Sequence, residues 1–68
     1  MKITHLGTES GDTGCPSVFA TDKGTFLVQG WVVTDEAALS ELRKRGLPAH
    51  ETVVEIPAAL AKHFPPVA

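Results

Sequence analysis

The clearest pattern in the chain is a pair of apolar, β-branched and aromatic runs separated by a short polar turn. The runs are residues 17–21 and 25–33, and residues 22–24 (Asp-Lys-Gly) lie between them. Such residue types favour strands, and a glycine at the end of the turn accepts the left-handed backbone that tight hairpins use. The pattern therefore predicts a β-hairpin.

Side chains alternate between the two faces of a strand, so the second run predicts a strand with two largely apolar faces. Leu27 and Trp31 are expected on one face, beside Phe19 from the first run. A tryptophan on a sheet face has to be covered. The cover is expected to be the C-terminal segment of the chain, its N-terminal segment, or another protein.

A helix is predicted directly after the hairpin. Thr34 suits the N-cap, and the acidic residues 35–36 suit the positive end of the helix dipole. The basic residues 43–45 suit its negative end, and Gly46 is a typical helix stop.

The remaining segments complete a small α+β domain. Residues 52–56 are predicted as a third strand and residues 57–63 as a short helix, while residues 7–16 have the composition of a loop. Residues 1–6 fit an additional strand, but the segment is too short for its pattern to establish one. We expect residues 1–68 to form one domain of order ββαβα, with one small sheet and the main helix on one of its faces.

Composition excludes several classes of protein. With 43% apolar and 21% charged residues in a chain of 68, the sequence is globular rather than disordered. The formal net charge of −2 provides no broad positive field, which makes nucleic acid an unlikely partner. Neither a signal peptide nor a membrane span is recognisable, so we expect a cytoplasmic protein.

Small size makes self-association attractive. Domains of this length usually need a disulfide, a metal or a second subunit for stability. Cys15 is the single cysteine, so an intramolecular disulfide is excluded. We therefore expect either a homodimer or another protein partner.

No catalytic, metal or cofactor site is predicted. Residues 12–14 match the tripeptide of aspartic proteases but do not follow an apolar strand. His5, His50 and His63 lack the spacing of zinc ligands, with or without Cys15. Cys15 has no adjacent cation to activate it, so a thiol function remains only an alternative to a packing role.

One basic cluster keeps a DNA-binding alternative open. Arg43, Lys44 and Arg45 are consecutive near the end of the predicted helix and could contact phosphates. However, the helix dipole favours cations there, and Glu41 is spaced to pair with Arg45. A solvated helix end explains the cluster equally well.

Three segments resemble a family of short uncharacterised bacterial proteins. They are residues 14–16 (Gly-Cys-Pro), residues 21–31 (Thr-Asp-Lys-Gly-Thr-Phe-Leu-Val-Gln-Gly-Trp) and residues 51–57 (Glu-Thr-Val-Val-Glu-Ile-Pro). Members of this family are often encoded near helix-turn-helix regulators. The resemblance implies a regulatory neighbourhood and assigns no activity to any residue.

The sequence thus leads to one main hypothesis and two alternatives. The main hypothesis is a non-enzymatic protein-interaction or regulatory accessory module that acts through Phe19, Leu27 and Trp31. The alternatives are a DNA-binding regulator that uses residues 43–45 and a thiol-dependent protein that uses Cys15.

Overall fold

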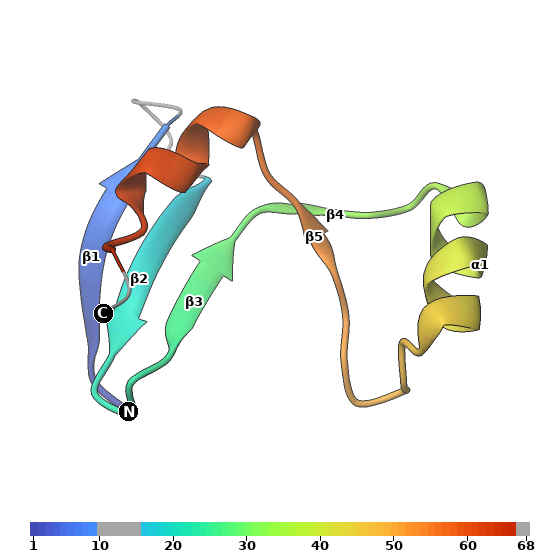
Figure 1. Ribbon diagram of the computed structural model, residues 1–68, viewed down its shortest axis with the longest axis horizontal. Helices are drawn as coiled ribbons and strands as arrows, with labels where there is room; N and C mark the ends of the chain where they lie inside the picture. The colour runs from blue at the N-terminus through green and yellow to red at the C-terminus, as the bar shows by residue number, and fades with distance from the viewer. Residues whose placement is uncertain (10–15, 67–68) are drawn as a thin grey trace.

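The computed structural model describes residues 1–9 and 16–66, and its largest element is a three-stranded antiparallel sheet. Strands β1 (Ile3–Thr8), β2 (Ser17–Thr21) and β3 (Phe26–Gln29) lie in the order β1-β2-β3 (Figure 1). The additional N-terminal strand therefore exists. It extends two residues beyond Leu6, into the segment predicted as loop.

The predicted hairpin is confirmed in β2 and β3, including its turn. Thr21 N–H donates to the carbonyl of Thr25 over 2.9 Å, and Gly24 has a φ of 78°. The predicted length of the second strand is wrong, because β3 ends at Gln29. Trp31 begins a separate strand.

A second, two-stranded sheet follows the break. Strand β4 (Trp31–Val32) pairs antiparallel with β5 (Val54–Glu55). The predicted strand over residues 52–56 is therefore shorter in the structure and consists of β5 alone. Gly30 causes the break, because a Cβ there would lie 2.6 Å from the Glu55 carbonyl oxygen. Only glycine permits the returning chain to pass so closely.

Helix α1 (Glu36–Arg45) forms where the sequence predicts it, one residue later than Thr34 implied. Asp35 is the N-cap, and its Oδ1 accepts from Ala37 N–H over 3.3 Å. Gly46 ends the helix with a φ of 110°, as predicted. Among the described residues, no helix has the length and apolar character needed to cross a membrane.

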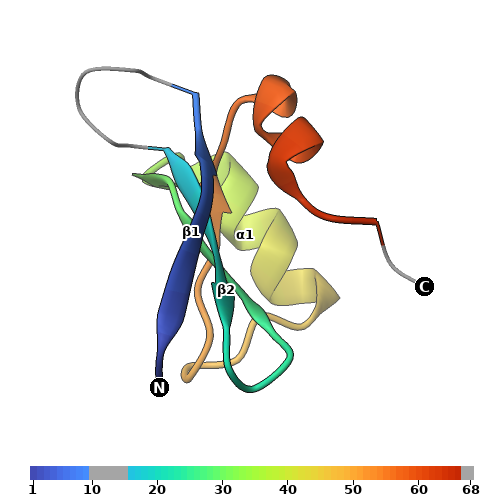
Figure 2. The same cartoon turned by 90° about the vertical axis from the view of Figure 1, so that its left-hand side faces the viewer.

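A short 3₁₀ helix covers the three-stranded sheet. This helix, η1 (Ala58–His63), packs on β1 and β2, as Figure 2 shows. Leu60 from η1 and Val18 from β2 are fully buried, and the Phe64 ring meets Phe26 edge-on with centroids 5.7 Å apart. In the part of the chain that is described, the fully buried apolar side chains are those of Val18, Leu60 and Pro16.

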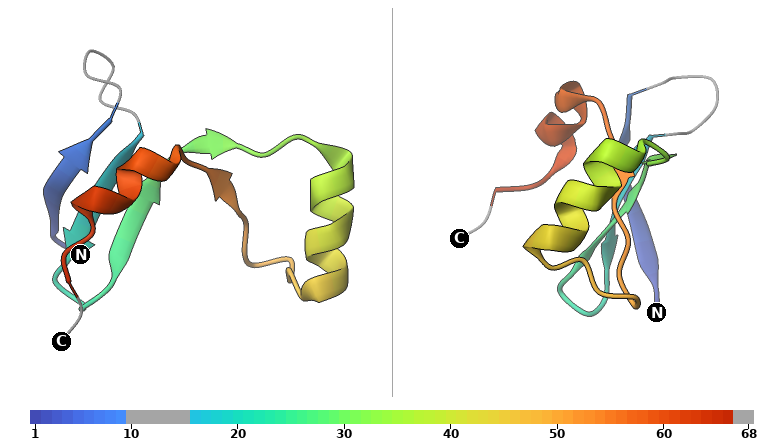
Figure 3. Two further views of the ribbon diagram at one scale, coloured as in Figure 1. Left: turned by 45° about the horizontal axis from the view of Figure 1, so that its top comes forward. Right: turned by 90° about the vertical axis from the view of Figure 1, so that its right-hand side faces the viewer.

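The prediction that the main helix covers a sheet face is wrong. The paired strands β4 and β5 carry α1 away from the three-stranded sheet, to the far end of the molecule (Figures 1 and 3). Helix α1 has no buried residue. We call residues 30–57 the arm.

The sheet consequently has one covered and one open face. Val18 and its partner Val28 lie on the side of η1, so Phe19 and its partner Leu27 lie on the other side. The expectation that the C-terminal segment covers the face of Phe19 and Leu27 is therefore wrong, because η1 covers the opposite face. We use the term open sheet face for Ile3, His5, Phe19 and Leu27.

Candidate functional site

Two of the three residues predicted for an interaction face lie side by side. Phe19 and Leu27 are direct partners across β2 and β3. The His5 ring joins them, with its centroid 5.4 Å from that of Phe19 and a tilt of 55°. Leu27 is 40% exposed and Ile3 54%, so this cluster is apolar and open to solvent.

The third residue, Trp31, lies in the arm rather than in the same sheet. It pairs with Glu55 in the two-stranded ladder and is 49% exposed. The strand break at Gly30 therefore divides the predicted face between two ladders. Both parts are accessible, and their role in binding stays a prediction.

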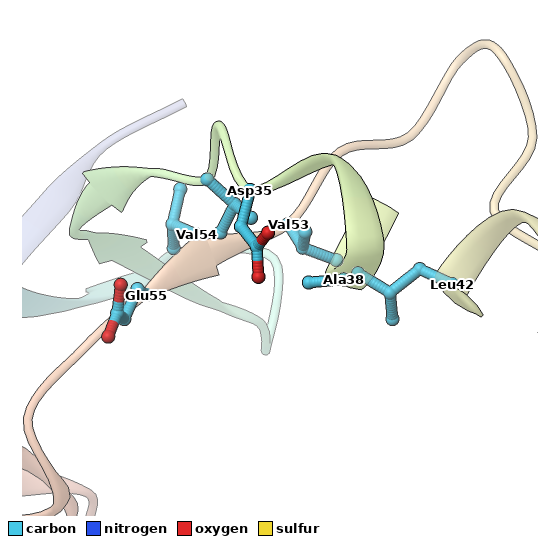
Figure 4. Close-up of a pocket in the computed structure, with 7 residues that line it drawn as sticks. Asp35, Ala38, Leu42, Val53, Val54 and Glu55 are labelled. Carbon is cyan, nitrogen blue, oxygen red and sulfur yellow. The ribbon is translucent and has the colours of Figure 1, made fainter. Parts of the chain in front are cut away.

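The arm also contains an apolar hollow that the sequence did not predict. It encloses about 390 Å³ between α1 and the strands of the arm, and it is open on one side (Figure 4). Ala38 and Leu42 point toward Val53 across it, and the Asp35 and Glu55 carboxylates lie at its rim. The sequence signal was the spacing of Ala38 and Leu42, which puts both on one side of the helix.

The basic cluster is largely engaged in ion pairs on its own helix. Arg45 Nε donates to Glu41 Oε1 over 3.0 Å, as the spacing predicted. Arg43 Nη1 lies 3.7 Å from Glu36 Oε2. Such exposed pairs add little stability, but they offset the positive charge that a phosphate backbone would require.

A polar cluster that the sequence did not reveal ties η1 to β1. Lys62 Nζ and His63 Nε2 both donate to Glu9 Oε1 over 2.9 Å. The His63 ring rests on Gly7, where there is no Cβ to displace it. Glu9 and His63 are 54 positions apart, so no local pattern could link them.

This cluster predicts an acid sensitivity. The hydrogen bond from Lys62, and next the one from His63, holds the pKa of Glu9 below its ordinary value of 4.5. A lowered pKa in the folded state stabilises the fold above that ordinary value, and the contribution disappears as the pH falls through the lowered pKa. We expect the urea midpoint of the native chain to fall more than that of Glu9→Gln when the pH drops from neutral to below 4.5.

The matched control for the acid sensitivity is Glu41→Gln, which removes an exposed carboxylate from α1. It should show the full acid sensitivity of the native chain. Equal losses in the native chain and in Glu9→Gln would show that Glu9 does not anchor η1.

Three polar side chains are linked by hydrogen bonds beside the open sheet face, and the innermost hydroxyl group is buried. His5 Nε2 is 2.6 Å from Thr8 Oγ1, which is 2.7 Å from Ser17 Oγ. Ser17 is only 1% exposed, so a substrate cannot reach its hydroxyl. Within residues 1–9 and 16–66, no three His, Cys, Asp or Glu side chains gather as a metal site would require.

The remaining sequence candidates are placed as follows. Cys15 and residues 12–14 lie outside the described residues. His50 lies in the turn after α1, far along the chain from the cluster of His63. The structure therefore brings none of the predicted zinc candidates together in its described part.

Comparison with known proteins adds no assignment. The chain matches no protein-family model, no curated protein and no solved structure. The function is therefore argued from the geometry of the open sheet face and the arm.

Proposed function

We propose that this protein is a small non-enzymatic interaction module that binds another protein chain through its exposed apolar surfaces. The observation that carries the proposal is the open sheet face, where Phe19 and Leu27 pair across two strands with only one side of the sheet covered by η1. Contiguous exposed apolar surface of this kind is typical of protein-binding sites.

The composition of the arm supports the same proposal. Trp31 is 49% exposed and Val32 is 78% exposed, within one short strand. Tryptophan is a frequent anchor in protein interfaces, because it buries a large area at low entropic cost. We also propose a regulatory setting for the binding, which is an expectation from the sequence resemblance alone.

The two alternative functions receive less support. Arg43 and Arg45 are paired with carboxylates of their own helix, which weakens the case for DNA. Cys15 lies outside the described residues, so the thiol-dependent alternative rests on the sequence alone.

The test is the accessibility of the apolar surfaces in dilute solution. Trp31 is the single tryptophan, so its fluorescence reports on the arm alone. We expect acrylamide to quench Trp31 readily at concentrations where light scattering gives the mass of one chain. We also expect a hydrophobic dye to bind the open sheet face, and Leu27→Asp should weaken that binding.

Ser40→Asp is the matched control, since it adds the same charge on the outer side of α1 and should leave dye binding unchanged. A complex at every accessible concentration would support the proposal equally. A monomer with shielded Trp31 and no dye binding would overturn it, because both surfaces would then be covered within one chain.

A further inference from the structure

We propose that the partner is a second copy of this chain, and that two copies exchange their arms. In this dimer the hollow between α1 and the arm strands of one copy receives Phe19 and Leu27 from the open sheet face of the other. The hollow of the second copy receives Phe19 and Leu27 of the first copy in the same way. The inference rests on the proposed function and names the partner for the same surfaces.

The chain exposes more area than a compact monomer of its mass. A compact monomer of 7.2 kDa is expected to expose about 4100 Å². This chain exposes 5146 Å². The difference of about 1000 Å² is close to the area of about 800 Å² that one partner contributes to a stable interface.

The two uncovered surfaces are complementary in kind. Small α+β domains bury a sheet face against a helix, and this chain has an open sheet face and a helix, α1, with no buried residue. Ala38 and Leu42 present the apolar side of α1 to the hollow. Phe19 and Leu27 are apolar side chains that can enter an open hollow of about 390 Å³.

The charges at the two surfaces also fit. The carboxylates of Asp35 and Glu55 lie at the rim of the hollow. None of the residues in β1, β2 or β3 is acidic, and the open sheet face carries His5. In the proposed dimer, the Asp35 and Glu55 carboxylates of one copy therefore face a sheet of the other copy whose strands carry no acidic residue, so no carboxylates repel each other there.

The path of the chain prevents the same contact within one copy. The pairing of β4 with β5 and the close passage of Gly30 past Glu55 hold α1 at a distance from its own sheet (Figure 3). An element that cannot reach its own surface but can reach the identical surface of a second copy gives a closed, two-fold symmetric dimer. Both hollows and both open sheet faces are then used.

The test uses complementary charges at the two surfaces. Leu27→Glu places a carboxylate on the sheet face, and Leu42→Lys places an ammonium group in the hollow. Each variant alone buries two unpaired charges in its homodimer, so we expect each to dissociate at concentrations at least about 30-fold higher than the native chain does. An equimolar mixture should recover a dimer, because one contact is then native and the other pairs glutamate with lysine.

The matched control mixture combines Leu27→Glu with Leu42→Glu, which has the same positions and like charges. It should stay monomeric by light scattering. Recovery in the first mixture also shows that both variants are folded.

The alternative results are distinct. Monomers in both mixtures, with a dimeric native chain, would overturn arm exchange and leave the proposed function standing. If Leu27→Glu and Leu42→Lys each dimerised as tightly as the native chain, arm exchange would also be overturned and the proposed function would stand. A native monomer that binds the dye and exposes Trp31 would overturn the second copy as partner, whereas a native monomer that does neither would overturn the proposed function as well.

Discussion

Replacing Leu60 with alanine is expected to unfold a large fraction of the protein. Leu60 is the largest of the fully buried side chains of the described core, so the change removes a large part of the contact between η1 and the sheet. Leucine-to-alanine changes in cores cost about 2–5 kcal/mol. At about 0.05–0.15 kcal/mol per residue, the whole chain has a free energy of unfolding of only about 3–10 kcal/mol.

Urea unfolding followed by circular dichroism measures this effect. Lys23→Ala is the control, since it shortens an exposed side chain in the hairpin turn and should change stability by no more than about 0.5 kcal/mol. If Leu60→Ala cost as little as this control, then η1 would not be docked on the sheet and the described core would be wrong.

Replacing Gly7 with alanine is the second change with a large expected effect. The new methyl group would lie 2.0 Å from Nδ1 of His63, inside the space of the imidazole ring. The ring has to move, and its hydrogen bond with Glu9 is then lost. Overpacking of this kind costs about 1–3 kcal/mol.

The cause can be isolated with a double variant. His63→Ala removes the ring, so Gly7→Ala should cost much less in a His63→Ala background than in the native chain. Urea midpoints of the native chain, the two single variants and the double variant give the coupling. Additive effects would contradict the contact between Gly7 and His63.

The parts of the fold that sequence analysis predicted correctly are those with local causes. The hairpin turn follows from a glycine that can adopt positive φ, and α1 ends at Gly46 for the same reason. The start of α1 was misplaced by one residue, because Thr34 and Asp35 are both good caps and the sequence does not rank them.

The misplaced parts depend on contacts between distant segments. The alternation of residues 25–33 fits one continuous strand, whereas the chain breaks at Gly30, where Glu55 passes closely. Which helix covers the sheet was likewise undecidable from apolar spacing, since both α1 and η1 carry apolar residues. The structure gives that role to η1 because the arm holds α1 away.

The candidate site shows the same division. The placement of Phe19 and Leu27 on one face followed from the predicted hairpin and the alternation of its strands, and in the structure the two residues are direct partners. The separate location of Trp31 and the hollow beside Leu42 follow from the strand break, which no local pattern reveals.

Hydrogen exchange at the amides of α1, measured over a range of protein concentrations, tests the central claim most directly. This helix has ten residues and none of them is buried, and isolated helices of that length are marginal in water. If a second copy covers α1, its amides will become protected as the concentration rises and will lose protection on dilution. Rapid exchange at every concentration, or protection that does not depend on concentration, would contradict arm exchange.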